Sequence, residues 1–175
     1  MAEKMPGLIM VITGDGKGKT TAAVGQAIRA LGHGYHVYMI HFLKGRDYGE
    51  FLATVQMPNL TVVRAGRDDF VNRENPDPVD LELAKDGFSK AEKAVLSGDY
   101  DLVVLDEINV AVDYGLIDEA DVLELLKKKP SHVTVILTGR GASPELVKIA
   151  DTVSEVLAIK HHYNSGVKCC KGIEY

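Results

Sequence analysis

The sequence predicts an α/β fold in which about six mainly parallel strands carry helices on both faces. Short apolar runs rich in Val and Ile alternate along the chain with amphipathic helical patterns, as they do in doubly wound sheets. Most of these runs are continuously apolar, which is typical of strands that are covered on both faces. The predicted strands are residues 8–13, 36–42, 60–64, 102–106, 133–138 and 153–157.

The first predicted helix follows the first strand and contains Val24, Ala27, Ile28 and Leu31. Their i, i+3, i+4, i+7 spacing places them on one face, which is the pattern of a helix that packs on a core. Gly32 comes directly after the last of them, and a glycine at that place favours the end of a helix.

Three further helices are predicted from residues that favour helix ends. Pro78 can occupy the first turn of a helix that ends near Gly98. Asp118 can cap the next helix, which Pro130 brings to an end, and Ser143 can cap the last one. These helices separate the later strands, so the strands they connect are expected to be parallel.

The composition is that of an ordinary globular protein and excludes several classes of function. With 175 residues, of which 46% are apolar, the chain is expected to form one domain over residues 1–175. The net charge of −5 argues against a nucleic-acid partner, which needs a clustered basic face. No apolar run is long enough for a membrane span or a signal peptide, and the two Cys are adjacent. We therefore expect a cytoplasmic protein without disulfides.

The strongest local signal is a glycine-rich loop between the first strand and the first helix, which is the context of a phosphate-binding P-loop. Its residues are Thr13, Gly14, Asp15, Gly16, Lys17, Gly18, Lys19, Thr20 and Thr21. The backbone N–H groups of such a loop, together with the helix N-terminus, surround phosphate oxygens. We expect Lys19 to bridge phosphates, Lys17 to add a second cation, and the Thr20 hydroxyl to bind a magnesium ion.

The loop departs from the usual G-x-x-x-x-G-K-[ST] spacing at its first position. Counting back from Gly18 places Thr13 there, and Gly14 comes one residue late. We therefore expect the nucleotide to be held differently from that of an ordinary ATPase. A glycine-rich turn without a ligand is the alternative, which the flanking strand and helix disfavour.

Other polar residues follow predicted strands, at the sheet edge where α/β folds bind ligands. Asp106 and Glu107 end the fourth strand like the acids of a Walker B element, which supplies a carboxylate for magnesium. Arg140 follows the fifth strand and either reaches phosphate or lies in solvent. Arg29, on the first helix, reaches the nucleotide or a partner subunit, or has only a surface role. The irregular connection 66–80 is either functional or simply solvated.

A P-loop by itself does not identify the reaction, and three classes of function remain open at this point. A small-molecule kinase or an ATPase would transfer the terminal phosphate, with Glu107 as a candidate base. A regulatory module would bind ATP without chemistry. An adenosyl transferase would release triphosphate intact. The His pair 161–162 and the Cys pair 169–170 raise the question of zinc, but their spacing fits no common zinc pattern.

Taken in order, the motifs resemble the P-loop type of ATP:corrinoid adenosyltransferase, the cob(I)alamin adenosyltransferases. The resemblance is carried by residues 13–23, 44–45, 49–50, 103–107, 138–141, 150–155, 160–161, 166–168 and 172–175. That family's loop has the same shifted glycine and holds its triphosphate reversed. The resemblance implies a RecA-like P-loop NTPase fold, a homodimer, Mg²⁺ or Mn²⁺, and a reduced flavoprotein as electron donor. The implied reaction joins the adenosyl group of ATP to cob(I)alamin or a related corrinoid.

The resemblance also implies roles for individual residues. Lys17, Lys19 and the metal ion would neutralise the leaving triphosphate, and Glu107 would be the third catalytic residue. The implied metal ligands are Thr20, Glu107 and Asp106, although Glu107 could instead contact the ribose. The corrinoid would lie near residues 66–75. The residues expected to contact it are Phe70, Tyr48 and Glu50.

Overall fold

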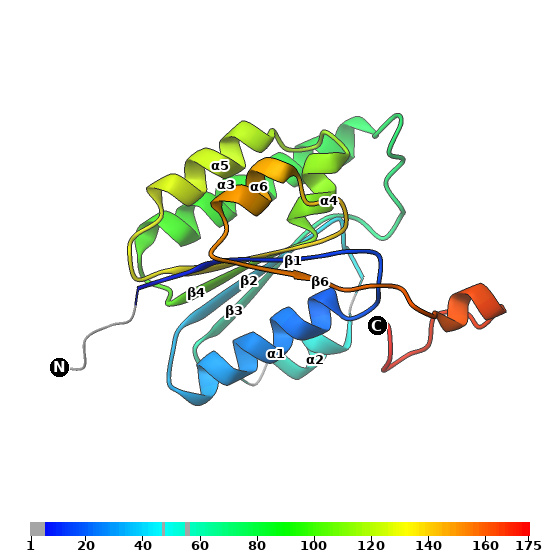
Figure 1. Cartoon of the computed structure of the whole chain (residues 1–175), viewed down its shortest axis with the longest axis horizontal. Helices are drawn as coiled ribbons and strands as arrows, with labels where there is room; N and C mark the ends of the chain where they lie inside the picture. Colours follow the sequence, from blue (N-terminus) through cyan, green and yellow to red (C-terminus); the bar gives the residue numbers. More distant parts are fainter. Residues whose placement is uncertain (1–5, 47, 55–56) are drawn as a thin grey trace.

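The structure is a computed structural model that describes residues 6–46, 48–54 and 57–175. Six strands of this part of the chain form one sheet, in the order β3-β2-β4-β5-β1-β6, and all neighbouring pairs are parallel. Helices cover both faces of the sheet, as the sequence predicted (Figure 1). The strands are β1 (Ile9–Thr13), β2 (Val37–Phe42), β3 (Leu60–Ala65), β4 (Leu102–Asp106), β5 (Thr134–Thr138) and β6 (Thr152–Glu155).

The predicted strands are confirmed, and their ends differ from the prediction by one or two residues at most. The central strands β2 and β4 are buried along their whole length, which explains their continuously apolar sequences. At the edge, β6 is exposed throughout and ends at Glu155, two residues earlier than predicted. After Glu155 the chain stays against the end of β1 and its loop, because Val156 donates to the carbonyl oxygen of Thr13 and accepts from the N–H of Gly16.

The helices predicted from end signals and periodicity are also confirmed. They are α1 (Lys19–Gly32), α3 (Pro78–Ser97), α5 (Glu119–Lys128) and α6 (Pro144–Ile149). Gly98 has a positive φ directly after α3, and the side chains of Asp118 and Ser143 accept hydrogen bonds from the first turns of α5 and α6. Local capping chemistry was therefore sufficient to locate these helix ends.

Three short elements were not predicted. They are α2 (Gly49–Thr54), α4 (Ile108–Asp113) and the 3₁₀ helix η1 (His162–Ser165). Each has six residues or fewer, which is too short for a 3.6-residue periodicity to be visible in a sequence. The position of α4 matters for the site, because Glu107 is its N-cap residue.

Two helix layers enclose the sheet (Figure 1). On one face, α1 packs through Ala23, Ala27 and Ala30, whose small side chains allow a close approach to the strands. On the other face, α3, α4, α5 and α6 cover an apolar cluster that includes Ile40 and Leu137. No helix in the described residues is long and apolar enough to cross a membrane.

A glycine on α3 sets how closely this helix approaches β3. A Cβ atom added to Gly87 would lie 2.3 Å from Ala65 Cβ and 3.2 Å from the Phe42 ring. We expect Gly87→Ala to lower the free energy of unfolding by about 1–3 kcal/mol through overpacking. This loss should outweigh the gain in helix propensity of about 1 kcal/mol. Chemical denaturation measures the difference.

Gly25→Ala is the matched control for this substitution. Gly25 is exposed on α1, and a Cβ atom added to it would meet no atom within 4 Å beyond the adjacent backbone of its own helix. That variant should be neutral or more stable by up to about 1 kcal/mol. A Gly87→Ala protein as stable as the parent would contradict the close packing of α3 on the sheet.

Candidate active site

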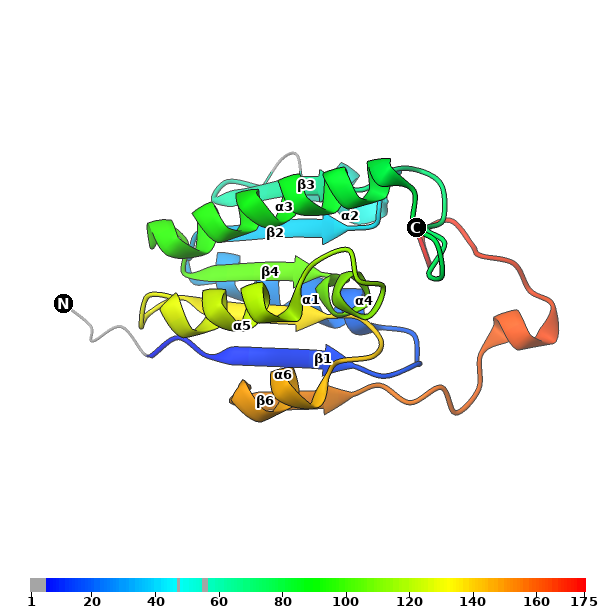
Figure 2. The ribbon, with the colours of Figure 1, turned by 90° about the horizontal axis from the view of Figure 1, so that it is seen from above.

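A cleft of about 690 Å³ lies at the carboxyl ends of the strands. Figure 2 shows the strands pointing toward this edge, with the segment after β6 running past it before the chain turns back. The cleft is lined by the loop after β1, by residues that follow β2, β4 and β5, and by residues 70–71 and 172–175. Segments far apart in the sequence thus converge where parallel α/β sheets bind ligands.

The glycine-rich loop has two positions at which its backbone conformation favours glycine. Gly14 and Gly18 have φ values of 95° and 116°. A Cβ atom on Gly14 would lie 2.5 Å from the carbonyl oxygen of Val156, and the Gly16 N–H donates to that same oxygen at 2.7 Å. The chain after β6 therefore lies directly against the loop. This contact and the positive φ explain why glycine stands at position 14.

Both lysines of the loop donate hydrogen bonds to main-chain carbonyl groups. The Lys19 ammonium lies 2.7 Å from the Gly16 carbonyl oxygen, and burial lowers the pKa of Lys19. The Lys17 ammonium lies 2.7 Å from the carbonyl oxygen of Ile173, in the C-terminal segment. A bound polyphosphate would offer both groups stronger, charged acceptors.

The two arginines that the sequence raised as candidates lie in different places. Arg140 lines the cleft, with its Nε 3.7 Å from the Asp15 carboxylate. Arg29 lies in the last turn of α1, is exposed, and donates a hydrogen bond to Gln26. Ten residues of helix separate it from Lys19 by about 15 Å. Within this chain Arg29 therefore has a surface position, and its contact with a nucleotide or a partner subunit stays a prediction.

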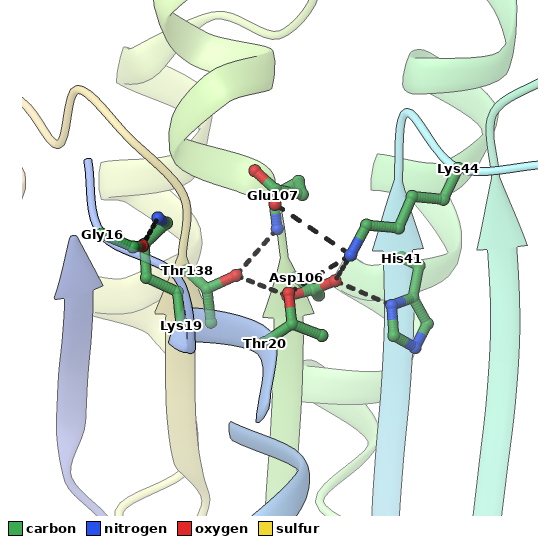
Figure 3. A network of polar contacts seen from close by, with 8 residues as sticks. All are labelled: Gly16, Lys19, Thr20, His41, Lys44, Asp106, Glu107 and Thr138. Carbon is green, nitrogen blue, oxygen red and sulfur yellow. Dashed lines mark hydrogen bonds and ion pairs between the residues drawn. The ribbon is translucent and has the colours of Figure 1, made fainter. Parts of the chain in front are cut away.

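The carboxylate of Asp106 is the centre of a buried polar network (Figure 3). Its Oδ1 accepts hydrogen bonds from the hydroxyls of Thr20 and Thr138, at 2.8 and 2.6 Å. Its Oδ2 accepts from His41 Nδ1 and Lys44 Nζ, at 2.8 and 2.7 Å. Burial by itself would raise the pKa of Asp106, but the charge of Lys44 and the hydrogen bond from His41 hold that pKa well below its ordinary value.

Two members of this network, His41 and Lys44, were not predicted as site residues. His41 is a fully buried polar residue in the apolar strand β2, and it pairs with Asp106 in the register of β2 and β4. A histidine inside a continuously apolar strand was the available signal. Lys44 had entered only as part of the family resemblance. Burial alone would lower the pKa of Lys44, but the charges of Asp106 and Glu107 raise it, so the ammonium is charged.

Glu107 lies between this network and the cleft. Its φ of 63° is uncommon for a residue other than glycine, and its N–H donates to the Thr138 hydroxyl at 2.9 Å. Its carboxylate lines the cleft, 4.0 Å from the Lys44 ammonium. Burial and the adjacent charge of Asp106 raise the pKa of Glu107. Of the two acids at the end of β4, Glu107 therefore faces the cleft and Asp106 is enclosed.

The three predicted metal ligands, Thr20, Asp106 and Glu107, fit Mg²⁺ or Mn²⁺ by their chemistry. All three offer oxygen atoms, which these cations prefer. A cation already lies near all three, because Lys44 Nζ is 4.0 Å or less from an oxygen of each. Within the described residues, no group of three or more His, Cys, Asp or Glu could hold a metal ion. A metal here would therefore need oxygens of a bound nucleotide beside those of the protein.

The residues expected to contact a corrinoid, Phe70, Tyr48 and Glu50, all line the cleft. The Phe70 side chain is 98% exposed, so a large apolar group stands free at the same site as the cationic loop. The Tyr48 ring centre lies 5.3 Å from the Lys44 ammonium. Residues 172–175 line the cleft as well, although the sequence had indicated them only as a matching family segment.

Comparisons with known proteins decide the family. Residues 5–175 match the family described as ATP:corrinoid adenosyltransferase BtuR/CobO/CobP. The chain belongs to this family. It is 38% identical, over 177 aligned positions, to the corrinoid adenosyltransferase of Escherichia coli K12, and the match covers 99% of the chain and 88% of that protein. The all-parallel sheet with its phosphate loop is the RecA-like P-loop fold that the resemblance implied.

Two further relatives support the same assignment. The corrinoid adenosyltransferase CobA of Salmonella typhimurium LT2 is 36% identical, with coverage of 99% of the chain and 88% of that protein. The corrinoid adenosyltransferase of Pseudomonas aeruginosa PAO1 is 34% identical, with coverage of 97% and 84%. The family resemblance that the ordered motifs carried is thereby confirmed.

The raised pKa of Glu107 predicts a pH-dependent stability for the protein without metal or nucleotide. A carboxyl whose folded-state pKa is raised contributes its full stability below its ordinary value of 4.5 and loses it as pH rises through the folded-state pKa. Glu107→Gln should therefore be more stable than the parent at pH 7, and this advantage should shrink toward pH 4.5.

Chemical denaturation in the presence of a chelator, from pH 4.5 to 8, measures this effect. Glu82→Gln, which changes an exposed carboxylate on α3, controls for the loss of one charge. If the difference between Glu107→Gln and the parent does not change with pH, the environment described for Glu107 is wrong.

Proposed function

We propose that this chain transfers the 5′-deoxyadenosyl group of ATP to the cobalt(I) atom of cob(I)alamin or a related corrinoid and releases triphosphate. The family to which the chain belongs acts on ATP and a corrinoid by its own description. The observation that carries the proposal is one cleft that combines a phosphate loop, the carboxylate of Glu107 and a freely exposed aromatic ring.

The proposed reaction forms one bond and breaks another at ribose C5′, and it needs no proton transfer. Cobalt(I) gives its pair to ribose C5′, and a cobalt–carbon bond forms. The bond between C5′ and the triphosphate oxygen breaks, and the triphosphate leaves with that pair, so the cobalt becomes cobalt(III). Because no general base is required, the protein has to orient the two substrates and neutralise the leaving group.

Cations that already surround the loop would neutralise the charge of the triphosphate. Lys19, Lys17 and Arg140 lie near protein oxygens, which phosphate oxygens would replace. Mg²⁺ or Mn²⁺, held by Thr20 and Glu107, would orient the triphosphate and add positive charge beside it. Asp106 is the third candidate ligand, and its Oδ1 accepts a hydrogen bond from the Thr20 hydroxyl at 2.8 Å.

The corrinoid would bind on the side of the cleft that carries Phe70, Tyr48 and Glu50. We assign Phe70 to the lower face of the corrinoid, where an apolar ring excludes a lower axial ligand and favours the four-coordinate form that is reduced to cobalt(I). A homodimer and a reduced flavoprotein as electron donor are part of the same proposal, on the ground of the family resemblance. The two exposed free cysteines, 169 and 170, agree with a reducing, cytoplasmic location.

The kinase or ATPase alternative gains no support from the three relatives described above, all of which are named as corrinoid adenosyltransferases. A kinase needs an acceptor hydroxyl and a base beside the terminal phosphate. The two classes differ in their products, because a kinase or an ATPase leaves ADP and an adenosyl transferase leaves triphosphate.

The decisive test mixes the protein with ATP, Mg²⁺ and chemically reduced cobalamin in the absence of oxygen. We expect formation of a cobalt–carbon bond, seen in the absorption spectrum, with one triphosphate for each adenosylcobalamin. Lys19→Ala should lower kcat/KM by at least about 100-fold, because the leaving group loses a buried cation. ADP as the product would refute the proposal, and unchanged kinetics in Lys19→Ala would remove the loop from the mechanism.

Phe70→Ala tests the corrinoid side of the cleft. We expect about a 10-fold loss in kcat/KM for the corrinoid, with the KM for ATP unchanged, because the apolar contact lies away from the phosphates. The four-coordinate cobalt(II) signal should weaken in parallel. Tyr163→Ala removes an exposed aromatic side chain that does not line the cleft and serves as the control. A normal four-coordinate signal in Phe70→Ala would move this role to another residue.

A further inference from the structure

We infer that the Lys44 ammonium is a built-in cation that holds the metal position in the absence of nucleotide and keeps free divalent ions out. It leaves that position when a metal ion arrives bound to triphosphate. The inference rests on the proposed function in one respect only, which is the identity of the incoming ligand as a metal–ATP complex.

The geometry around Lys44 Nζ is that of a cation among the expected metal ligands. Nζ lies 2.7 Å from Asp106 Oδ2, 3.2 Å from Thr20 Oγ1 and 4.0 Å from Glu107 Oε1. Figure 3 shows the ammonium reaching across from the end of β2 to the acids at the end of β4. A divalent ion bound to these three oxygens would have to occupy nearly the same space.

The charges at this position explain why the ammonium excludes a free metal ion. Asp106 and Glu107 bring two carboxylates to one place, and Lys44 balances one of them. The Lys44 side chain is only 15% exposed, so water screens it poorly. A second cation that entered beside it would meet a like charge at a few ångströms in a poorly solvated site, where repulsion is strong.

A metal ion that is already bound to triphosphate changes this balance. The phosphate oxygens supply new acceptors for the ammonium, and Lys44 itself lines the cleft in which they would lie. Its long side chain can turn from Asp106 toward those oxygens without a change in the strand. Lys44 would then become a further cation beside the leaving group, and metal and nucleotide would enter together.

The competing interpretation is that Lys44 serves only to balance the buried charge of Asp106. Both interpretations predict that a neutral residue at position 44 lowers stability, because it leaves a buried carboxylate less well compensated. They differ in metal binding. A lysine at the metal position raises the affinity for a free metal ion far more, when its charge is removed, than a lysine elsewhere in the cleft.

The test is a titration of the full chain with Mn²⁺ alone, without ATP or corrinoid, followed by the electron paramagnetic resonance signal of the free ion. We expect weak binding by the parent and at least about a 10-fold tighter Kd in Lys44→Met, which keeps the stem and removes the charge. Lys44→Gln should bind as tightly and retains a donor for Asp106, so it replaces Lys44→Met if the latter does not fold. Lys44→Arg keeps the charge and should bind as weakly as the parent.

Lys17→Met is the matched control, because Lys17 lies in the same cleft but donates to Ile173 and not to the three ligand oxygens. Its Mn²⁺ affinity should equal that of the parent. Unchanged or weaker Mn²⁺ binding in both neutral Lys44 variants would overturn the inference, as would tight binding in Lys44→Arg. The assay contains neither substrate, so its outcome is independent of whether the chain transfers an adenosyl group.

Discussion

The rest of the site depends on the hydrogen bonds that the buried carboxylate of Asp106 accepts. The carboxylate accepts them from Thr20 on α1, His41 on β2, Lys44 after β2 and Thr138 on β5. An ionised carboxylate without exposure is tolerated only when such partners compensate it. One charge therefore fixes the end of the phosphate loop, the start of the β2–α2 connection and the end of β5 relative to one another.

The same constraint separates the tasks of the two adjacent acids. Thr138 donates its hydroxyl proton to Asp106 and accepts the N–H of Glu107, so the inner acid and the main chain of the outer acid share one hydroxyl. This bond holds Glu107 in its uncommon backbone conformation, and the side chain of Glu107 then faces the cleft. A local strain of this kind at the edge of a sheet is typical of residues that meet a ligand.

Much of the fold and part of the site could be predicted because their signals are local. The strands, the capped helices, the loop at 13–21 and the acids at the end of β4 are each recognised from residues close together in sequence. His41 and Lys44 could not be found in that way, because their roles come from the pairing of β2 with β4, across more than sixty residues. Arg29 shows the converse, because the ten residues between it and Lys19 run along a helix and place it at the surface, away from the loop.

The cations of the cleft can exchange their protein acceptors for phosphate oxygens, and this exchange explains how an acidic chain can bind a highly charged anion. The net charge is −5, yet the cations of the cleft each lie near a protein oxygen; these pairs are Lys17 with Ile173, Lys19 with Gly16, Lys44 with Asp106, and Arg140 with Asp15. A triphosphate would replace neutral or shared acceptors with its own charged oxygens, so the cations need no reorganisation over long distances. Because the proposed chemistry removes no proton, this preorganised charge is where most of the catalytic effect has to arise.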